Sequence, residues 1–275
     1  MDVRGIVDGL TQGIRSEKDD YIKDGLLYCG KCQTPKQTRI EVMGQIRTPM
    51  CLCKCESERL AKMDEIRSKQ EAMDKVQRLK RMGFPDAEMR KWTFEADDLA
   101  NEAVSKMAKR YVDNFKMMRA KGKGLLLYGS VGTGKTFISA CIANALIEQG
   151  HPCLVTNFAR LINSISGMYE GKQEYLDRLT WFDLIVIDDL ASERNTEYMG
   201  EIVQTIIDAR YRCGKPLIVT TNLTPQELKH PQDVRKQRIY SRLFEMCVPV
   251  EVSGKDRRKD KLKQDYKQME EVLGL

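Results

Sequence analysis

The feature that most constrains the fold is a phosphate-binding loop between a short apolar segment and a helical one. Residues 124–128 read GLLLY, and the next eight residues read GSVGTGKT, which fits the pattern G-x-x-x-x-G-K-[ST]. Glycines in such a loop let consecutive backbone N–H groups turn inward around an anion, and the helix that follows adds the positive end of its dipole. The sequence therefore predicts nucleotide binding by a strand, a loop and a helix in that order.

The whole loop supplies the expected ATP-binding residues: Gly129, Ser130, Val131, Gly132, Thr133, Gly134, Lys135 and Thr136. We expect Lys135 to reach the β- and γ-phosphates and Thr136 to hold Mg²⁺ through its hydroxyl. The helix after the loop is expected to end at Gly150 and Pro152 and to bury one face. That face carries Ile138, Cys141, Ile142, Ala145 and Leu146.

Two further apolar runs each end in polar residues. Residues 184–187 read LIVI and precede Asp188 and Asp189, and residues 217–221 read LIVTT and precede Asn222. Continuous apolar runs are typical of parallel strands buried on both faces, and ligands gather at the carboxyl ends of such strands. With helical segments between the runs, the sequence predicts an α/β fold in which helices flank a parallel sheet.

These polar residues have expected roles in phosphate chemistry. We expect Asp188 to bind Mg²⁺, and Asp189 to orient or deprotonate the attacking water. Asn222 is placed to hydrogen-bond the γ-phosphate or that water. The alternatives are that the two aspartates only cap the following loop and that Asn222 belongs to an ordinary turn.

Five of the nine cysteines fall within 27 residues: Cys29, Cys32, Cys51, Cys53 and Cys55. A C-x-x-C pair and a second cluster, separated by 18 residues rich in turn formers and β-branched residues, predict a zinc site built on a small β-ribbon. A redox dithiol is the alternative, but no βαβ pattern follows the C-x-x-C. Spacing alone leaves open whether Cys51 or Cys55 joins Cys53. The other four cysteines are expected to be buried apolar residues.

The segment after Cys55 is a charged helix with apolar residues three and four apart, and Gly83 and Pro85 are expected to end it. We interpret it as a connector or a partner-binding helix, with packing favoured for its apolar stripe. The net charge of +6 permits a nucleic-acid partner without demonstrating one. No apolar run reaches the roughly 20 residues of a membrane span, and the N-terminus lacks the order of a signal peptide, so we expect a cytoplasmic protein without a membrane partner.

Four segments carry a family resemblance: YGSVGTGKT, LIVIDDL, ARYRCGKPLIVTTNL and RIYSRLFEMCVPVEVSGKDRR. Over residues 92–260 the chain resembles the AAA+ ATPases of the DnaC/DnaI helicase-loader group, which includes the IstB transposition ATPases. The C-x-x-C followed by C-x-C and Glu56 resembles the N-terminal zinc module of DnaI-like loaders, which binds the replicative helicase. This resemblance favours Cys29, Cys32, Cys53 and Cys55 as the zinc ligands.

The resemblance also implies residue roles. It gives Asn222 the sensor-1 role and Arg242 the role of an arginine finger that acts on ATP held by a neighbouring subunit. Arg238 lies four residues earlier on the same helical face, where it either assists Arg242 or only pairs with a glutamate. Arg258 matches the sensor-2 position, and Arg257 stays open as the alternative; the other interpretation of both residues is a solvated basic tail without a role at the nucleotide. Asp189 replaces the usual water-orienting glutamate, which is compatible with slow, regulated hydrolysis. A helical lid is expected to be absent or reduced.

Residues 158–180 correspond to a region that faces single-stranded DNA in related loaders, with Arg160, Tyr169 and Lys172 as candidate contacts; helix packing explains this stretch equally well. The expected domains are a zinc-binding, helicase-interaction module at 1–58, a connector at 59–91, an AAA+ domain at 92–252 and a charged tail at 253–275. The expected function is ATP-dependent loading of a hexameric replicative helicase onto single-stranded DNA. The alternatives are an IstB-like transposition adaptor and a nucleotide-gated binding protein without turnover.

Overall fold

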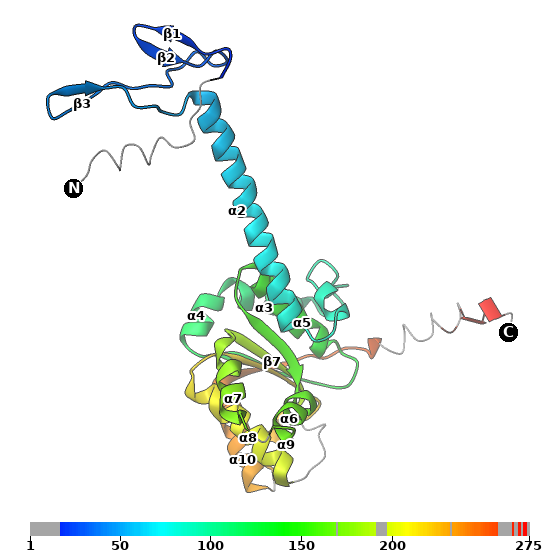
Figure 1. Ribbon diagram of the computed structural model, residues 1–275. Helices are drawn as coiled ribbons and strands as arrows, with labels where there is room; N and C mark the ends of the chain where they lie inside the picture. The colour runs from blue at the N-terminus through cyan, green and yellow to red at the C-terminus, as the bar shows by residue number, and fades with distance from the viewer. Residues whose placement is uncertain are drawn as a thin grey trace. The chain divides into compact units, whose positions relative to one another are not determined.

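The computed structural model describes residues 17–168, 170–190, 197–231 and 233–257, together with residues 266, 269–270 and 272–273 (Figure 1). The chain divides into two compact units between Asp74 and Lys75. This division lies inside the predicted connector, and the predicted domain boundaries at residues 58, 91 and 252 stay predictions.

The N-terminal unit is built from two short antiparallel hairpins. β1 (Tyr21–Lys23) pairs with β2 (Leu26–Tyr28), and β3 (Ile40–Val42) pairs with β4 (Gln45–Arg47). Each two-residue turn, Asp24-Gly25 and Met43-Gly44, has positive φ at both positions. This is the geometry of type I′ turns, whose twist matches that of the strands they join. The second hairpin lies in the spacer between the two cysteine clusters, where the sequence predicts a small ribbon.

Helix α2 (Lys54–Gly83) follows and ends at the glycine that the sequence predicts. A Cβ on Gly83 would lie 2.2 Å from the carbonyl oxygen of Cys153, so the close approach at this point requires glycine. Only the last part of the predicted apolar stripe packs, because Leu79 is buried and Val76 lies against the same core. The expectation of packing is wrong for the earlier part, where the exposed side chains are Met63, Ile66 and Met73.

The C-terminal unit contains a five-stranded sheet with the order β6-β7-β8-β5-β9, in which all neighbouring strands are parallel. Its strands are β5 (Gly124–Tyr128), β6 (Cys153–Asn157), β7 (Leu184–Leu190), β8 (Leu217–Thr221) and β9 (Cys247–Glu251). The predicted α/β fold is therefore confirmed. The apolar runs become the central strands because alternate residues face two different cores.

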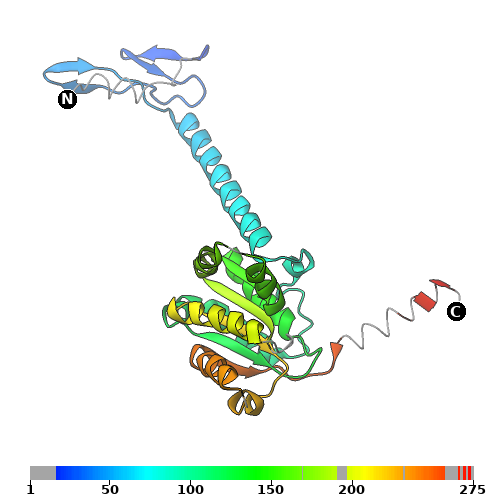
Figure 2. The same ribbon diagram turned by 60° about the horizontal axis from the view of Figure 1, so that its bottom comes forward.

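The first core lies between the sheet and a group of helices that includes α3 (Glu102–Asp113), α4 (Phe115–Ala120) and α5 (Lys135–Glu148). The second core lies on the opposite face (Figure 2). Its helices are α6 (Phe158–Ser166), α7 (Lys172–Trp181), α8 (Glu197–Arg212), α9 (Pro225–Lys229) and α10 (Val234–Met246). Helix α5 is buried on nearly all sides, not on one face as predicted, because α3 and the short 3₁₀-helix η1 (Glu88–Lys91) cover its outer side.

Candidate nucleotide and metal sites

A cavity of about 390 Å³ lies over the phosphate-binding loop at the carboxyl ends of the strands. It brings together residues of three separate sequence motifs: Val131, Gly132, Gly134, Lys135, Thr136, Asp189 and Asn222. The first five come from the β5–α5 loop and the start of α5, Asp189 comes from β7, and Asn222 follows β8. This volume and this set of polar groups suit a nucleotide with its phosphates on the loop.

The loop itself has the backbone of an anion-binding turn. Gly129, Gly132 and Gly134 all have positive φ, and a Cβ on Gly129 would lie 2.4 Å from the carbonyl oxygen of Val252. The Lys135 ammonium group is folded across the loop, where it donates to the carbonyl oxygens of Gly129 at 2.8 Å and Ser130 at 2.7 Å. Phosphate oxygens are charged and therefore stronger partners for this ammonium group than neutral carbonyls.

Thr136 and Asp188 meet where the sequence predicts a magnesium site. The Thr136 hydroxyl donates to the Asp188 carboxylate, with its Oγ1 at 2.9 Å from Oδ1 and 3.0 Å from Oδ2. Burial raises the pKa of Asp188 above its usual value, and hydrogen bonds from the Thr220 and Thr136 hydroxyls oppose that rise. A hydroxyl and a carboxylate are oxygen ligands of the kind that Mg²⁺ prefers, so this pair fits the ion.

Asp189 has an unusual backbone for a residue inside a strand. Its φ is +59°, and the register between β7 and β8 shifts at this point, between Ile187 and Leu190. Aspartate tolerates the left-handed region better than most residues other than glycine. The bulge places the Asp188 carboxylate against Thr136 while Asp189 lines the cavity.

Arg242 is not among the described residues that line this cavity. It lies on α10, where its Nη1 forms an ion pair with Asp208 on α8, and its guanidinium lies 5.8 Å from the ring centroid of Tyr211. A finger that acts on a neighbouring subunit is not required to reach the cavity of its own chain. Arg238 is exposed on the same helix.

Among the two candidates for the sensor-2 position, Arg258 lies outside the described residues, and Arg257 lines the cavity. The backbone N–H of Arg257 donates to the Gly132 carbonyl oxygen at 3.1 Å, and its Nη1 lies 3.1 Å from Oδ1 of Asp98. Of the candidate DNA contacts, Tyr169 lies outside the described residues, and Arg160 and Lys172 are exposed on α6 and α7.

Two aromatic side chains at the cavity, Trp92 and Phe137, have no role in the sequence analysis. Their ring centroids are 5.9 Å apart, and they add an apolar wall to a polar site. Phe137 directly follows the loop motif, so its place beside the cavity is predictable from the sequence. Trp92 is distant in the sequence, and only the tertiary structure brings it to the cavity. The buried Asn144 of α5 fixes the segment that carries Trp92, because its Nδ2 donates to the carbonyl oxygens of Met89 at 2.9 Å and Trp92 at 2.8 Å.

Replacing Asn144 with alanine is expected to lower the free energy of unfolding of the C-terminal unit by about 2–3 kcal/mol, because two carbonyl groups lose their donor. Urea unfolding followed by tryptophan fluorescence measures this change. The matched control is Asn163→Ala on α6, where the asparagine is exposed, and it is expected to change stability by less than about 0.5 kcal/mol. Equal stability of the two variants would contradict the anchoring role of Asn144.

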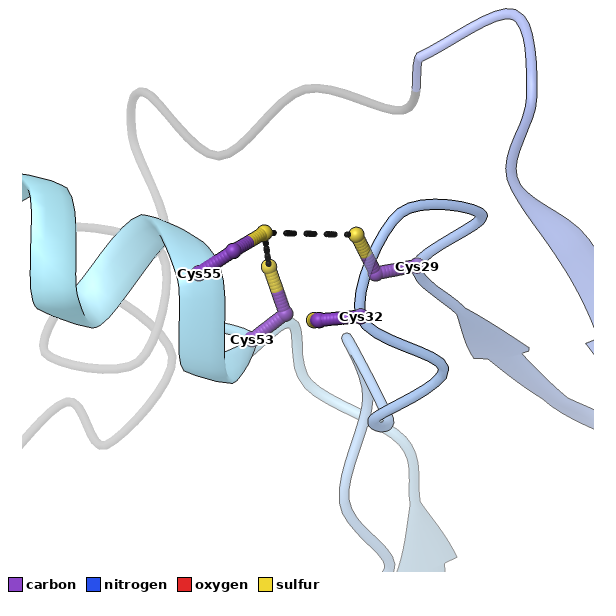
Figure 3. Close-up of side chains that lie close together, drawn as sticks. All are labelled: Cys29, Cys32, Cys53 and Cys55. Carbon is purple, nitrogen blue, oxygen red and sulfur yellow. Dashed lines mark hydrogen bonds between the residues drawn. The ribbon is translucent and has the colours of Figure 1, made fainter.

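The N-terminal unit brings four cysteine side chains together (Figure 3). The sulfur atoms of Cys29, Cys32, Cys53 and Cys55 all lie within 4.8 Å of one another. Sγ of Cys55 is 3.6 Å from that of Cys29 and 3.5 Å from that of Cys53. Four thiolates around a tetrahedral zinc ion at about 2.3 Å would stand roughly 3.8 Å apart, so the cluster fits zinc. Cys51 is not in this group; its thiol points to the Pro35 carbonyl oxygen at 3.6 Å.

The surroundings of the cysteine cluster shift the pKa values of its thiols in opposite directions. The Thr34 hydroxyl, 3.0 Å from Sγ of Cys32, lowers the pKa of that thiol to about 5. Hydrogen bonding with Cys53 raises the pKa of Cys55 to about 12, so a cation is needed to ionise all four thiols together. A buried ion pair between Lys36 and Asp20, 2.7 Å long, supports the turn from Cys29 to Cys32, because Asp20 also accepts from the backbone N–H of Gly30.

Among the described residues, no helix combines the length and the apolar character needed to cross a membrane.

The comparisons with known proteins agree with this geometry. Residues 55–265, more than half of the chain, match the family model described as "IstB-like ATP binding protein". The replicative helicase loader DnaI of Bacillus subtilis (strain 168) is 25% identical over 207 residues, which cover 70% of this chain and 67% of DnaI. The replicative helicase loader DnaC of Escherichia coli (strain K12) is 28% identical over 130 residues, 46% of this chain, so the match spans only about half (51%) of DnaC.

Solved structures show the same relationship. A crystal structure of DnaI superimposes with a TM-score of 0.53 and 26% identity, covering 63% of this chain and 94% of that chain. A crystal structure of the DnaC helicase loader superimposes with a TM-score of 0.52 at 22% identity, covering 61% of this chain and all of that one (100%), and it shows the shared fold. The chain therefore belongs to the family of IstB-like ATP-binding proteins and carries the AAA+ P-loop domain of the IstB/DnaC type.

Proposed function

We propose that this protein is an ATP-dependent loader that delivers a hexameric replicative helicase onto single-stranded DNA during the initiation of replication. The observation that carries the proposal is the combination of the two sites in one chain. A cavity over a phosphate-binding loop lies in the unit that resembles DnaI and DnaC, and a four-cysteine cluster lies in the unit that precedes it. Relatives at 25–28% identity carry the name replicative helicase loader.

In the nucleotide site, backbone N–H groups of the loop and the Lys135 ammonium group bind the phosphates. Thr136 and Asp188 would hold Mg²⁺, which when bound would supply positive charge beside the phosphates. Asp189 and Asn222 orient the attacking water. Arg257, the sensor-2 candidate that lines the cavity, adds a positive charge beside the loop.

The hydrolysis we propose is slow and regulated. Aspartate at position 189 is one methylene shorter than the glutamate usual in AAA+ proteins, so it reaches less far toward the water. Arg242 completes the site of a neighbouring subunit, so hydrolysis depends on self-association. Arg160 and Lys172 are proposed contacts to single-stranded DNA. The N-terminal unit with its zinc site is the proposed helicase-binding unit, and the proposed location of the protein is the cytoplasm.

The test is a loading assay with the purified full-length protein and the replicative helicase of its native host. The helicase is incubated with circular single-stranded DNA, with and without the protein and ATP, and helicase bound to DNA is measured by gel filtration. We expect a stable complex between the two proteins and more helicase on the circle when the protein and ATP are present. If the two proteins form no complex and loading of the helicase is not stimulated, the proposal is refuted.

The family description supports a second candidate function, that of a transposition adaptor of the IstB kind that remodels target DNA and recruits a transposase. That function predicts ATP-dependent filaments on duplex DNA, which electron microscopy detects directly. The cysteine cluster argues against it, because the family model begins only at residue 55 and so leaves out three of the four clustered cysteines.

A further inference from the structure

Two consecutive threonines at the end of β8 join the carboxylates of β7 to the segment that carries Asn222. The first, Thr220, is fully buried, and its hydroxyl serves both aspartates. Its Oγ1 donates to Oδ1 of Asp188 at 2.5 Å and accepts from the backbone N–H of Asp189 at 3.0 Å. The same Asp188 oxygen accepts from Thr136, so Thr220 lies opposite the loop threonine across one carboxylate.

The second, Thr221, is also fully buried and bridges the residues that follow Asp189 and Asn222. Its Oγ1 donates to the carbonyl oxygen of Leu190 at 3.1 Å and accepts from the backbone N–H of Leu223 at 3.1 Å. The two hydroxyls therefore connect the same two segments at successive positions. The Thr220 hydroxyl fixes the backbone of Asp189 and the carboxylate of Asp188. The Thr221 hydroxyl fixes Leu190, which follows Asp189, and Leu223 in the turn after β8.

The Thr220 bonds lie where the backbone ladder between β7 and β8 is interrupted, and the Thr221 bond to Leu190 lies where the ladder resumes. The register shifts between Ile187 and Leu190, and the intervening Asp189 has a left-handed backbone that an aspartate adopts only at some cost. A residue in a bulge loses its ladder partner, and its side chain can then be aimed by other contacts. Here the Thr220 hydroxyl accepts from the backbone N–H of Asp189 inside the bulge, and the Thr221 hydroxyl adds a bond to Leu190, its partner in the ladder.

We propose that Thr220 and Thr221 are positioning residues for ATP hydrolysis: they hold Asp189 and Asn222 at a fixed spacing around the attacking water, and Thr220 also aims Asp188 at the magnesium site. Neither hydroxyl is exposed to the cavity, so each acts through the residues it holds. The inference rests on the proposed hydrolysis of ATP. It goes further because it assigns the spacing of the water-orienting groups to β8.

The experiment compares Thr220→Val and Thr221→Val, which keep the shape and lose the hydroxyl, with Thr220→Ser, which keeps the hydroxyl. Loss of a group that orients metal or catalytic residues typically costs about 10–100-fold in activity or metal affinity. Both valine variants are expected to lower kcat for ATP hydrolysis by about 10–100-fold and to leave the Kd for ATP at saturating Mg²⁺ within about twofold. Thr220→Ser is expected to restore most of kcat.

A second measurement requires no hydrolysis. Only Thr220 touches Asp188, so Thr220→Val is expected to raise the Mg²⁺ concentration needed for half-maximal binding of a fluorescent ATP analogue, and Thr221→Val is expected to leave it unchanged. Thr156→Val is the matched control, because Thr156 is a buried threonine on β6 that pairs with Ile187, before the bulge. It is expected to retain both the parent kcat and the parent Mg²⁺ dependence.

The outcomes separate this inference from the proposed function. Absence of ATP hydrolysis in the parent protein would refute the proposed function, while the Mg²⁺ titration would still test Thr220. Hydrolysis in the parent with unchanged kcat and unchanged Mg²⁺ dependence in both valine variants would overturn the inference alone. Equal loss in Thr220→Ser and Thr220→Val, together with a matching fall in Tm, would also overturn it, because that pattern indicates a structural role.

Discussion

An Arg242→Ala variant is expected to hydrolyse ATP at least about 10³-fold more slowly than the parent, because arginine fingers are worth about 10³–10⁵ in rate. The affinity of the chain for ATP is expected to stay the same, since Arg242 is not among the described residues at the cavity. The ion pair with Asp208 and the Tyr211 ring hold the guanidinium on α10. Steady-state hydrolysis at saturating ATP and equilibrium binding of ATP measure the two quantities separately.

Mixing two inactive variants tests whether the finger acts between subunits. Lys135→Ala keeps Arg242 and loses the phosphate-binding ammonium group, and Arg242→Ala keeps the intact cavity. In a mixture, a Lys135→Ala chain is expected to supply its finger to an Arg242→Ala neighbour, so part of the activity returns. Arg110→Ala removes an exposed arginine on α3 that has no assigned role; it is the control and is expected to stay within a few-fold of the parent. A mixture no more active than either variant alone would contradict action in trans.

The sequence predicts well those parts of the fold that a short run of contiguous residues determines. The loop motif needs only its own eight residues with a strand before and a helix after, and β7 and β8 are continuous apolar runs. The sequence does not indicate strand β9, because it is short, contains Pro249 and lies at the edge of the sheet, where a proline costs no ladder bond. The burial of α5 on nearly all sides was missed because it depends on helices distant in the sequence.

The site residues divide in the same way. Asp188, Asp189 and Asn222 are predictable because the carboxyl ends of parallel strands meet at one edge of the sheet. Trp92, Asn144 and the hydroxyls of Thr220 and Thr221 have no sequence signal of that kind, since their roles come from contacts across 30 or more residues. The spacing of the cysteines does not show whether Cys51 or Cys55 is the fourth zinc ligand. The structure distinguishes them, because Cys55 lies in the first turn of α2 and its sulfur atom lies in the cluster, whereas Cys51 is not in the cluster.

Removal of zinc is expected to unfold the N-terminal unit and to leave ATP binding intact. Among the described residues 17–74, the only buried apolar side chains are Cys29 and Cys53, while Ile22, Met43 and Ile46 are 74–90% exposed. A module with so little apolar core cannot offset the entropy of ordering its chain without a further link. A structural zinc site supplies about 10–16 kcal/mol of apparent binding free energy, which is enough to make folding depend on the metal.

The chain carries its own matched control for this prediction, because Cys51 and Cys55 are both thiols close to Cys53 in the sequence and only Cys55 lies in the cluster. Cys55→Ser and Cys29→Ser are expected to lose zinc, measured by metal analysis of the purified protein at about one ion per parent chain. Cys51→Ser is expected to keep it. Hydrogen exchange is expected to rise across residues 17–53 in the first two variants and to stay low in the strands of the sheet. A metal-free parent prepared without chelator, or equal zinc loss from Cys51→Ser and Cys55→Ser, would refute the assignment, since the four-sulfur geometry singles out Cys55.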